Sequence, residues 1–126
     1  MGRPSRHIIY TEIYQSEAKT FCEYLSTIGY NDKSCRSRYL SLKDFFCFLE
    51  SHKVFELKEI TAFEVSEFYR HVKERKSLRS AQPLKEKTVY DIMRCVQMYF
   101  GYLLRLQRIK INPASHIKFR IYKQRP

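Results

Sequence analysis

The sequence has few of the features that interrupt a polypeptide chain or anchor it in a membrane. It contains only three glycines and four prolines, and its uninterrupted apolar run at residues 99–104 falls far short of the ~20 residues that cross a bilayer. The N-terminal residues lack the apolar stretch and small-residue cleavage site of an export signal. Neither an internal repeat nor a low-complexity tract is present. These absences predict a protein that is neither membrane-spanning nor exported, and we expect a cytoplasmic location.

Cysteine occurs four times, at Cys22, Cys35, Cys47 and Cys95, but no two of these residues have the Cys-x-x-Cys spacing that zinc sites usually use. Each lies among apolar residues at helical spacing, where a reduced cysteine packs like a small hydrophobic side chain. We therefore predict four reduced thiols, no metal ion and no cofactor, in keeping with the reducing cytoplasm.

The balance of apolar and charged residues predicts one folded domain. Hydrophobic residues make up 44% of the 126-residue chain and aromatic residues 15%, whereas disordered chains combine high charge with low hydrophobicity. A chain of this length can bury a core of its own and is typical of a single domain.

Acidic residues are scarce toward the end of the chain. The whole sequence has 24 Lys or Arg and 13 Asp or Glu, a formal net charge of +11. Residues 87–126 hold nine of these basic side chains and a single acidic one, Asp91. So basic a segment in a folded domain indicates a polyanionic partner, and we predict double-stranded DNA. A solvated basic surface and a membrane-facing tail are the alternatives.

Apolar residues recur at steps of three and four along most of the chain, which predicts four helices and an all-α fold. The first helix is expected over residues 16–28, with Ser16 as N-cap and Gly29 at its end. The second is expected over residues 31–51 and starts at Asn31. The side chains expected to face inward are Ala18, Phe21, Cys22, Leu25 and Ile28 in the first helix, and Cys35, Tyr39, Leu42, Phe45, Phe46, Phe48 and Leu49 in the second.

The third predicted helix has the clearest start signal, because Thr61 and Glu64 match a capping box. The fourth is expected over residues 85–107, and Asn112 followed by Pro113 should stop it, since the residue before a proline avoids helical geometry. The side chains expected to face inward are Val65, Phe68 and Val72 in the third helix, and Val89, Ile92, Met93, Val96, Phe100, Leu103 and Leu106 in the fourth.

Three segments lack a helical pattern. Residues 76–86 form a polar connection, and residues 7–14 are expected to be extended. The alternation of apolar and polar residues over 117–122 is typical of a strand or an extended linker. The connection over 76–86 is too long for the tight turn of a helix-turn-helix motif, so a small stand-alone repressor is not expected.

Polar and cationic side chains line the opposite faces of the second and fourth predicted helices. Two interpretations stand: a solvated cationic face, or helices that enter a DNA groove and place Lys and Arg on phosphates, with Arg36 or Arg94 on guanine edges. The candidate contacts are Lys33, Arg36, Ser37 and Lys43 in the second helix, and Lys87, Thr88, Tyr90, Asp91 and Arg94 in the fourth.

The order of several short motifs resembles the core-binding domain of tyrosine recombinases, the phage-integrase family. The resemblance covers about residues 15–121. It implies a SAM-like bundle of four or five helices arranged as two crossed helical hairpins, with extended tails at both ends. The motifs are Gly29-Tyr30-Asn31 leading to Ser34 and Tyr39, Phe45 to Leu49, Glu59-Ile60-Thr61, Thr88-Val89 leading through Val96 to Tyr99-Phe100-Gly101-Tyr102-Leu103, and Ile111-Asn112-Pro113-Ala114.

The same resemblance implies how the chain is organised and what it does. Residues 1–14 would be an N-terminal extension, residues 15–115 the core-binding domain, and residues 116–126 the start of a linker to a separate catalytic domain. The domain would grip one face of a recombination site during DNA integration. Its implied DNA contacts are Ser34, Arg36, Ser37 and Lys43, then Lys87, Thr88, Asp91 and Arg94, and we add Lys118 at the start of the linker.

The chain departs from the family pattern at two positions. Lys85 stands where members commonly have a Ser or Thr cap, and Asp91 stands where they commonly have a basic or amide residue. Asp91 therefore either accepts a hydrogen bond from a cytosine or makes no contact with DNA.

Catalytic residues of that family are not expected in this chain. Tyrosine recombinases cleave DNA with a tyrosine nucleophile and hold the phosphate with arginines, including a His-x-x-Arg pair. None of the four histidines has an arginine three residues later. The residues that follow His7, His52, His71 and His116 at that spacing are Tyr10, Phe55, Glu74 and Phe119. We predict a domain that binds DNA and does not cleave it.

Two further interpretations concern protein partners. The first helix, which is nearly neutral and amphipathic, mediates self-association on DNA or is ordinary core. The alternative function for the whole chain is a helical protein–protein interaction module with a basic surface, which should expose a surplus of apolar residues. No small-molecule substrate is predicted.

Overall fold

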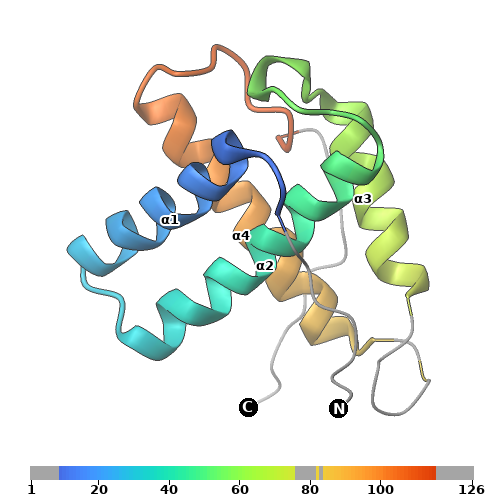
Figure 1. Ribbon diagram of the computed structural model, residues 1–126. Coiled ribbons are helices and arrows are strands. Elements are labelled where there is room, and N and C mark those ends of the chain that lie inside the picture. Colours follow the sequence, from blue (N-terminus) through green and yellow to red (C-terminus); the bar gives the residue numbers. More distant parts are fainter. Residues whose placement is uncertain (1–8, 76–81, 83, 116–126) are drawn as a thin grey trace. The chain divides into compact units, whose positions relative to one another are not determined.

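The computed structural model describes residues 9–75, 82 and 84–115. These residues form four α-helices and one short 3-10 helix, with no β-strand among them, so the predicted all-α class is confirmed. The predicted extended segment over 117–122 lies outside the described residues. The elements are α1 (Glu12–Thr27), α2 (Asp32–Ser51), η1 (Leu57–Glu59), α3 (Ala62–Glu74) and α4 (Glu86–Arg105) (Figure 1).

The chain divides after Ile60 into two units, each with its own internal contacts. The first unit holds α1, α2 and η1, and the second holds α3 and α4. In the part of the chain that the structure describes, none of the helices combines the length and apolar character that a membrane crossing requires.

In the first unit, α1 and α2 pack against each other as a helical hairpin. The ring of Tyr14 stacks on that of Phe46, with centroids 4.4 Å apart and planes within 4° of parallel. Burial of large apolar side chains is the main source of stability in such a contact. The buried side chains are Tyr14, Ala18, Phe21 and Leu25 of α1, and Cys35, Leu42, Phe45, Phe46, Phe48 and Leu49 of α2.

Helix α1 begins earlier than predicted. Its N-cap is Thr11 and not Ser16, and the Thr11 hydroxyl accepts a hydrogen bond from the backbone N–H of Tyr14. The expected extended segment over 7–14 is therefore wrong for residues 12–14, which are helical. The predicted inward position of Ile28 is also wrong, because this residue is the C-cap of α1 and is 52% exposed.

Helix α2 begins as predicted. Asn31 is its N-cap, and the Asn31 Oδ1 accepts a hydrogen bond from the backbone N–H of Ser34 at 2.8 Å. An asparagine side chain at this position satisfies one of the backbone donors that the first turn leaves without a partner.

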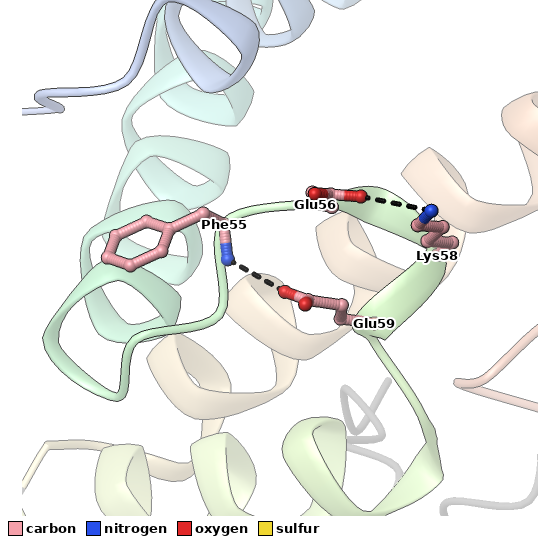
Figure 2. A network of polar contacts seen from close by, with 4 residues as sticks. All are labelled: Phe55, Glu56, Lys58 and Glu59. Carbon is pink, nitrogen blue, oxygen red and sulfur yellow. Dashed lines mark hydrogen bonds and ion pairs between the residues drawn. The ribbon is translucent and has the colours of Figure 1, made fainter.

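The segment that follows α2 is held by local polar contacts, which Figure 2 shows from close by. Glu59 Oε1 accepts a hydrogen bond from the backbone N–H of Phe55 at 3.2 Å, and Lys58 Nζ lies 3.4 Å from Glu56 Oε1. The Tyr14 hydroxyl donates to the backbone carbonyl of Val54 at 2.9 Å and so ties this segment to α1.

In the second unit, α3 contacts α4 and begins with the predicted capping box. The backbone N–H of Thr61 donates to Glu64 Oε1 at 2.7 Å. The predicted inward residues Val65, Phe68 and Val72 are all buried.

Helix α4 starts where the sequence predicts but ends sooner. Lys85 is its N-cap, and the Lys85 side chain makes no capping hydrogen bond. The helix ends at Arg105, well before Asn112, so the predicted stop is wrong and Leu106 is 52% exposed. Most of the predicted inward face is confirmed as buried: Ile92, Met93, Val96, Phe100 and Leu103, joined by Cys95, Tyr99 and Tyr102.

Helices α1, α2 and α4 end in the same way. A residue with positive φ follows each helix, and the backbone N–H of the next residue donates to a carbonyl five residues back, which is the Schellman arrangement. The positive-φ residues are Gly29 (φ 109°), Lys53 (φ 62°) and Gln107 (φ 61°), and the hydrogen bonds run from Tyr30 to Leu25, from Val54 to Leu49 and from Arg108 to Leu103.

Candidate nucleic-acid interface

The N-terminal half of α2 carries the first group of predicted DNA contacts. Lys33, Arg36 and Ser37 are exposed, whereas Ser34 is half-buried. The Arg36 side chain makes no hydrogen bond or ion pair with the residues that the structure describes. Its guanidinium is therefore available to an external anion.

Lys43, further along α2, is placed differently from the rest of this group. It is half-buried, and its Nζ lies 5.7 Å from the centroid of the Tyr39 ring. Lys43 and Arg36 line a groove between α1 and α2 with a volume of about 800 Å³, which Lys19 of α1 also lines. The structure therefore brings together three cations that the sequence analysis did not treat as one group.

The groove contains acidic side chains as well. Glu23 and Asp32 line it close to the connection between the two helices. Because α1 and α2 form a hairpin, Lys19 and Lys43 lie further from that connection. The groove thus has a mixed part near the hairpin connection, where Arg36 lies with the two acidic residues, and a basic part away from it.

The N-terminal half of α4 carries the second group of predicted contacts. Lys87, Thr88, Asp91 and Arg94 are exposed, and Tyr90 is half-buried. Arg94, like Arg36, makes no hydrogen bond or ion pair with the described residues. Residues three and four apart on a helix share one face, so Lys87, Asp91 and Arg94 form one exposed stripe.

Lys87 and Asp91 form an ion pair within this stripe. The Lys87 Nζ donates to Asp91 Oδ2 at 3.0 Å, across one turn of α4. Both side chains are about half exposed, at 56% and 53%. The carboxylate of Asp91 therefore offsets the charge of Lys87, which is the first lysine within α4.

The two groups of candidate contacts belong to different units of the chain, with the α2 group in the first unit and the α4 group in the second. Lys118, the remaining candidate, lies outside the described residues. The sequence also divides its charge between the units: residues 1–60 have nine basic and eight acidic side chains, and residues 61–126 have fifteen and five. The excess positive charge is therefore a property of the second unit.

The role of the first helix in the groove was not predicted from the sequence. Cys22 and Tyr39 were expected in the core, but both are half-buried in the groove wall. Lys19 was not singled out at all. The signal that could have identified it is its spacing of three residues from Cys22, which places both on the side of α1 that meets α2.

Metal ligands do not gather in the described residues. No group of three or more His, Cys, Asp or Glu side chains converges there in a way that could hold a metal ion. All four cysteines are free thiols, of which Cys35 and Cys95 are buried.

Comparison with protein-family models, with curated proteins and with solved structures finds no match to this chain. Any assignment of function therefore depends on the residues of the chain itself.

Proposed function

We propose that this chain is the core-binding domain of a tyrosine recombinase of the phage-integrase family, which grips one face of a recombination site. The observation that carries the proposal is the exposure of basic side chains on the N-terminal halves of α2 and α4, where the motif resemblance implies DNA contacts. We propose further that the helices form the two crossed hairpins of a SAM-like bundle. In this proposal the domain binds double-stranded DNA and does not cleave it.

Arg36 and Arg94 have the central role in the proposed interface. A guanidinium can bind the two acceptors of a guanine edge or a phosphate through paired hydrogen bonds. Because neither side chain has a partner among the described residues, binding DNA requires no intramolecular ion pair to break there. Lys33 and Lys87 would contact phosphates, which position the protein without reading sequence.

The proposed affinity is modest and depends strongly on salt. Each phosphate that a basic side chain neutralises releases condensed counterions, so affinity falls as salt rises. A single domain on one face of the duplex makes few such contacts. We expect a dissociation constant on the order of micromolar or weaker at physiological salt, within the range of non-specific DNA binding.

The test is fluorescence anisotropy of labelled duplex DNA titrated with the full chain at several salt concentrations. The wild type should bind with a steep negative salt dependence. The double variant Arg36→Ala plus Arg94→Ala should bind much more weakly. The salt slope, which is the slope of log affinity against log salt concentration, should fall in magnitude by about two, because each lost phosphate contact contributes about one.

The matched control removes two positive charges outside the proposed interface. Lys58→Ala plus Arg70→Ala deletes cations that pair with Glu56 and Glu67 on exposed surfaces of the two units. This control should retain most of the binding. Equal losses in the two double variants would show that binding follows net charge alone and would contradict the proposed interface.

Exposed apolar residues favour one alternative, a protein–protein interaction module. Leu104, Leu106 and Ile111 lie around the end of α4 and are 40%, 52% and 72% exposed. Exposed apolar clusters often mark interaction surfaces. A folded chain that fails to bind DNA even at low salt would support this alternative over the recombinase domain.

A further inference from the structure

Two cysteine side chains meet in the groove between α1 and α2. Cys22 lies on α1 and Cys35 on α2, and both line the groove. The Cys22 Sγ is 3.8 Å from the backbone carbonyl oxygen of Cys35. The Cys35 Sγ in turn lies 3.7 Å from the backbone carbonyl oxygen of Tyr30. A thiol that touches the backbone of a second cysteine on the adjacent helix is within the short range that a disulfide requires.

The two thiols differ in how far they are open to solvent. Cys22 is half-buried, whereas Cys35 is only 5% exposed. The groove, of about 800 Å³, is large enough for a small molecule to approach Cys22. Any group that becomes bonded to the Cys22 sulfur then lies next to Cys35.

The other two cysteines are less suited than Cys22 to form a disulfide with Cys35. Cys47 follows Cys35 on α2 by more than three turns, about 18 Å along the helix axis, which is too far for a disulfide. Burial, together with Glu50 and Asp44, raises the pKa of Cys47 to about 11, so little of its thiolate exists at neutral pH. Cys95 is 1% exposed and belongs to the second unit.

We propose that Cys22 and Cys35 form a reversible disulfide across the α1–α2 hairpin when the protein meets a low-molecular-weight disulfide such as glutathione disulfide. The Cys22 thiolate attacks one sulfur of the reagent, whose S–S bond breaks, and one glutathione leaves as its thiolate. Cys35 loses its proton to solvent, and its thiolate attacks the Cys22 sulfur and releases the second glutathione. Two protein thiols are oxidised and one reagent disulfide is reduced to two thiols.

The surroundings of Cys22 determine how fast its thiolate should react with glutathione disulfide. Burial, the contact with Cys35 and the nearby carboxylates of Glu23 and Asp32 raise the pKa of the Cys22 thiol above its ordinary value. Because the thiolate is the attacking species, the reaction should be slow at neutral pH and faster toward about pH 9.

The disulfide would close a loop that contains the Asn31 N-cap and the start of α2. A crosslink of this kind restricts the unfolded chain and should raise the melting temperature of the oxidised protein. Lys33 lies inside the closed loop and Arg36 next to it, so oxidation would fix the geometry of this end of the groove. The inference does not depend on DNA binding, and its test contains no DNA.

The test uses the folded chain incubated with glutathione disulfide at about pH 8 and about pH 9. Free thiols, counted after acid quenching and denaturation, should fall from four to two per chain. Trypsin cuts after Lys33 and Arg36 and so separates the two cysteines. A non-reducing digest should therefore contain peptide 20–33 linked to peptide 34–36, and a thiol reductant should release the link and lower the melting temperature again.

Single-residue variants test the order of the two steps, in which Cys22 reacts first and Cys35 second. Cys35→Ser should stop at a mixed disulfide on Cys22, seen as the mass of one added glutathione. Cys22→Ser should leave Cys35 unreacted in the folded protein, and the control Cys47→Ser should form the same linked peptide as the wild type. Three wild-type results would overturn the proposal without reliance on any variant: four thiols that persist at about pH 9, a glutathione that stays on Cys22, or a link to a different cysteine.

Discussion

Glu50, near the end of α2, accepts hydrogen bonds from both the backbone N–H and the side-chain hydroxyl of Thr11, the N-cap of α1. Both distances are 2.8 Å, and the two residues are 39 positions apart in the sequence. The carboxylate also accepts the backbone N–H of Tyr10. A buried acidic side chain on one helix therefore completes the N-terminus of the other, where negative charge is favoured.

Replacing Glu50 should destabilise the first unit. Glu50→Ala removes a charged acceptor and leaves the donors of Thr11 and Tyr10 without it, so we expect a loss of about 2–3 kcal/mol in the free energy of unfolding. Urea unfolding followed by circular dichroism measures this. Glu56→Ala, a change at an exposed carboxylate, should cost no more than about 0.5 kcal/mol. A Glu50→Ala protein as stable as that control would show that the cap contributes little.

Tyr14 should make stability sensitive to alkaline pH. Burial, together with Glu59, Glu50 and Glu56, raises the pKa of Tyr14 well above its ordinary value. The unfolded chain releases this proton near pH 10 while the folded chain retains it. Stability is therefore complete below about pH 10 and falls as pH rises further, because deprotonation favours the unfolded state.

Tyr14→Phe separates two effects of this residue. At pH 7 the variant should lose about 1 kcal/mol, because the hydrogen bond to the Val54 carbonyl is gone. Between about pH 10 and 11 it should lose less additional stability than the wild type does. Chemical unfolding at these pH values gives both numbers, and parallel losses would mean that Tyr14 does not control the alkaline transition.

Phe100 is expected to contribute strongly to the stability of the second unit. Its side chain is 1% exposed on α4, so Phe100→Ala should cost roughly 3–5 kcal/mol through lost burial and a residual cavity. Phe63 makes a matched control, because it is 66% exposed at the start of α3. Phe63→Ala should change stability by about 0.5 kcal/mol or less. Thermal unfolding of the two variants compares them directly.

Substitution of Asp91 distinguishes two interpretations of the exposed stripe that Lys87, Asp91 and Arg94 form on α4. If its carboxylate only neutralises Lys87, Asp91→Ala should tighten DNA binding and increase the salt slope by about one, because Lys87 gains a phosphate. Stability should change by about 0.5 kcal/mol or less, as expected for an exposed pair. If Asp91 instead accepts a hydrogen bond from cytosine, the variant should bind its preferred site more weakly. Anisotropy titrations with wild type and variant distinguish these results.

Local signals in the sequence were enough to locate two helix starts. Asn31 and the Thr61 and Glu64 pair each act within a single turn, so their role is visible in neighbouring residues. The start of α1 was missed because the Thr11 cap is completed by Glu50, a contact that only the folded hairpin creates. Ser16 has the right chemistry for a cap but lies inside the helix.

The exposure of some candidate contacts could also be predicted from local signals in the sequence. Helical spacing alone places Arg36 and Arg94 on polar faces, and both are exposed. The groove that joins Lys19, Arg36 and Lys43 depends on which side of α1 meets α2. That pairing is a tertiary property, and in the sequence only the spacing of Lys19 from Cys22 indicates it.

Lys53 and Gln107, the residues with positive φ at the ends of α2 and α4, are positions where a substitution should stabilise the fold. Both residues adopt positive φ, a conformation that costs an ordinary residue roughly 1 kcal/mol and that glycine or asparagine adopts with less strain. The hydrogen bonds to Leu49 and Leu103, and not the residue type, therefore define these two stops. Lys53→Gly and Gln107→Gly are accordingly candidates for stabilising substitutions, and we expect the natural sequence to lie below the stability that its own backbone permits.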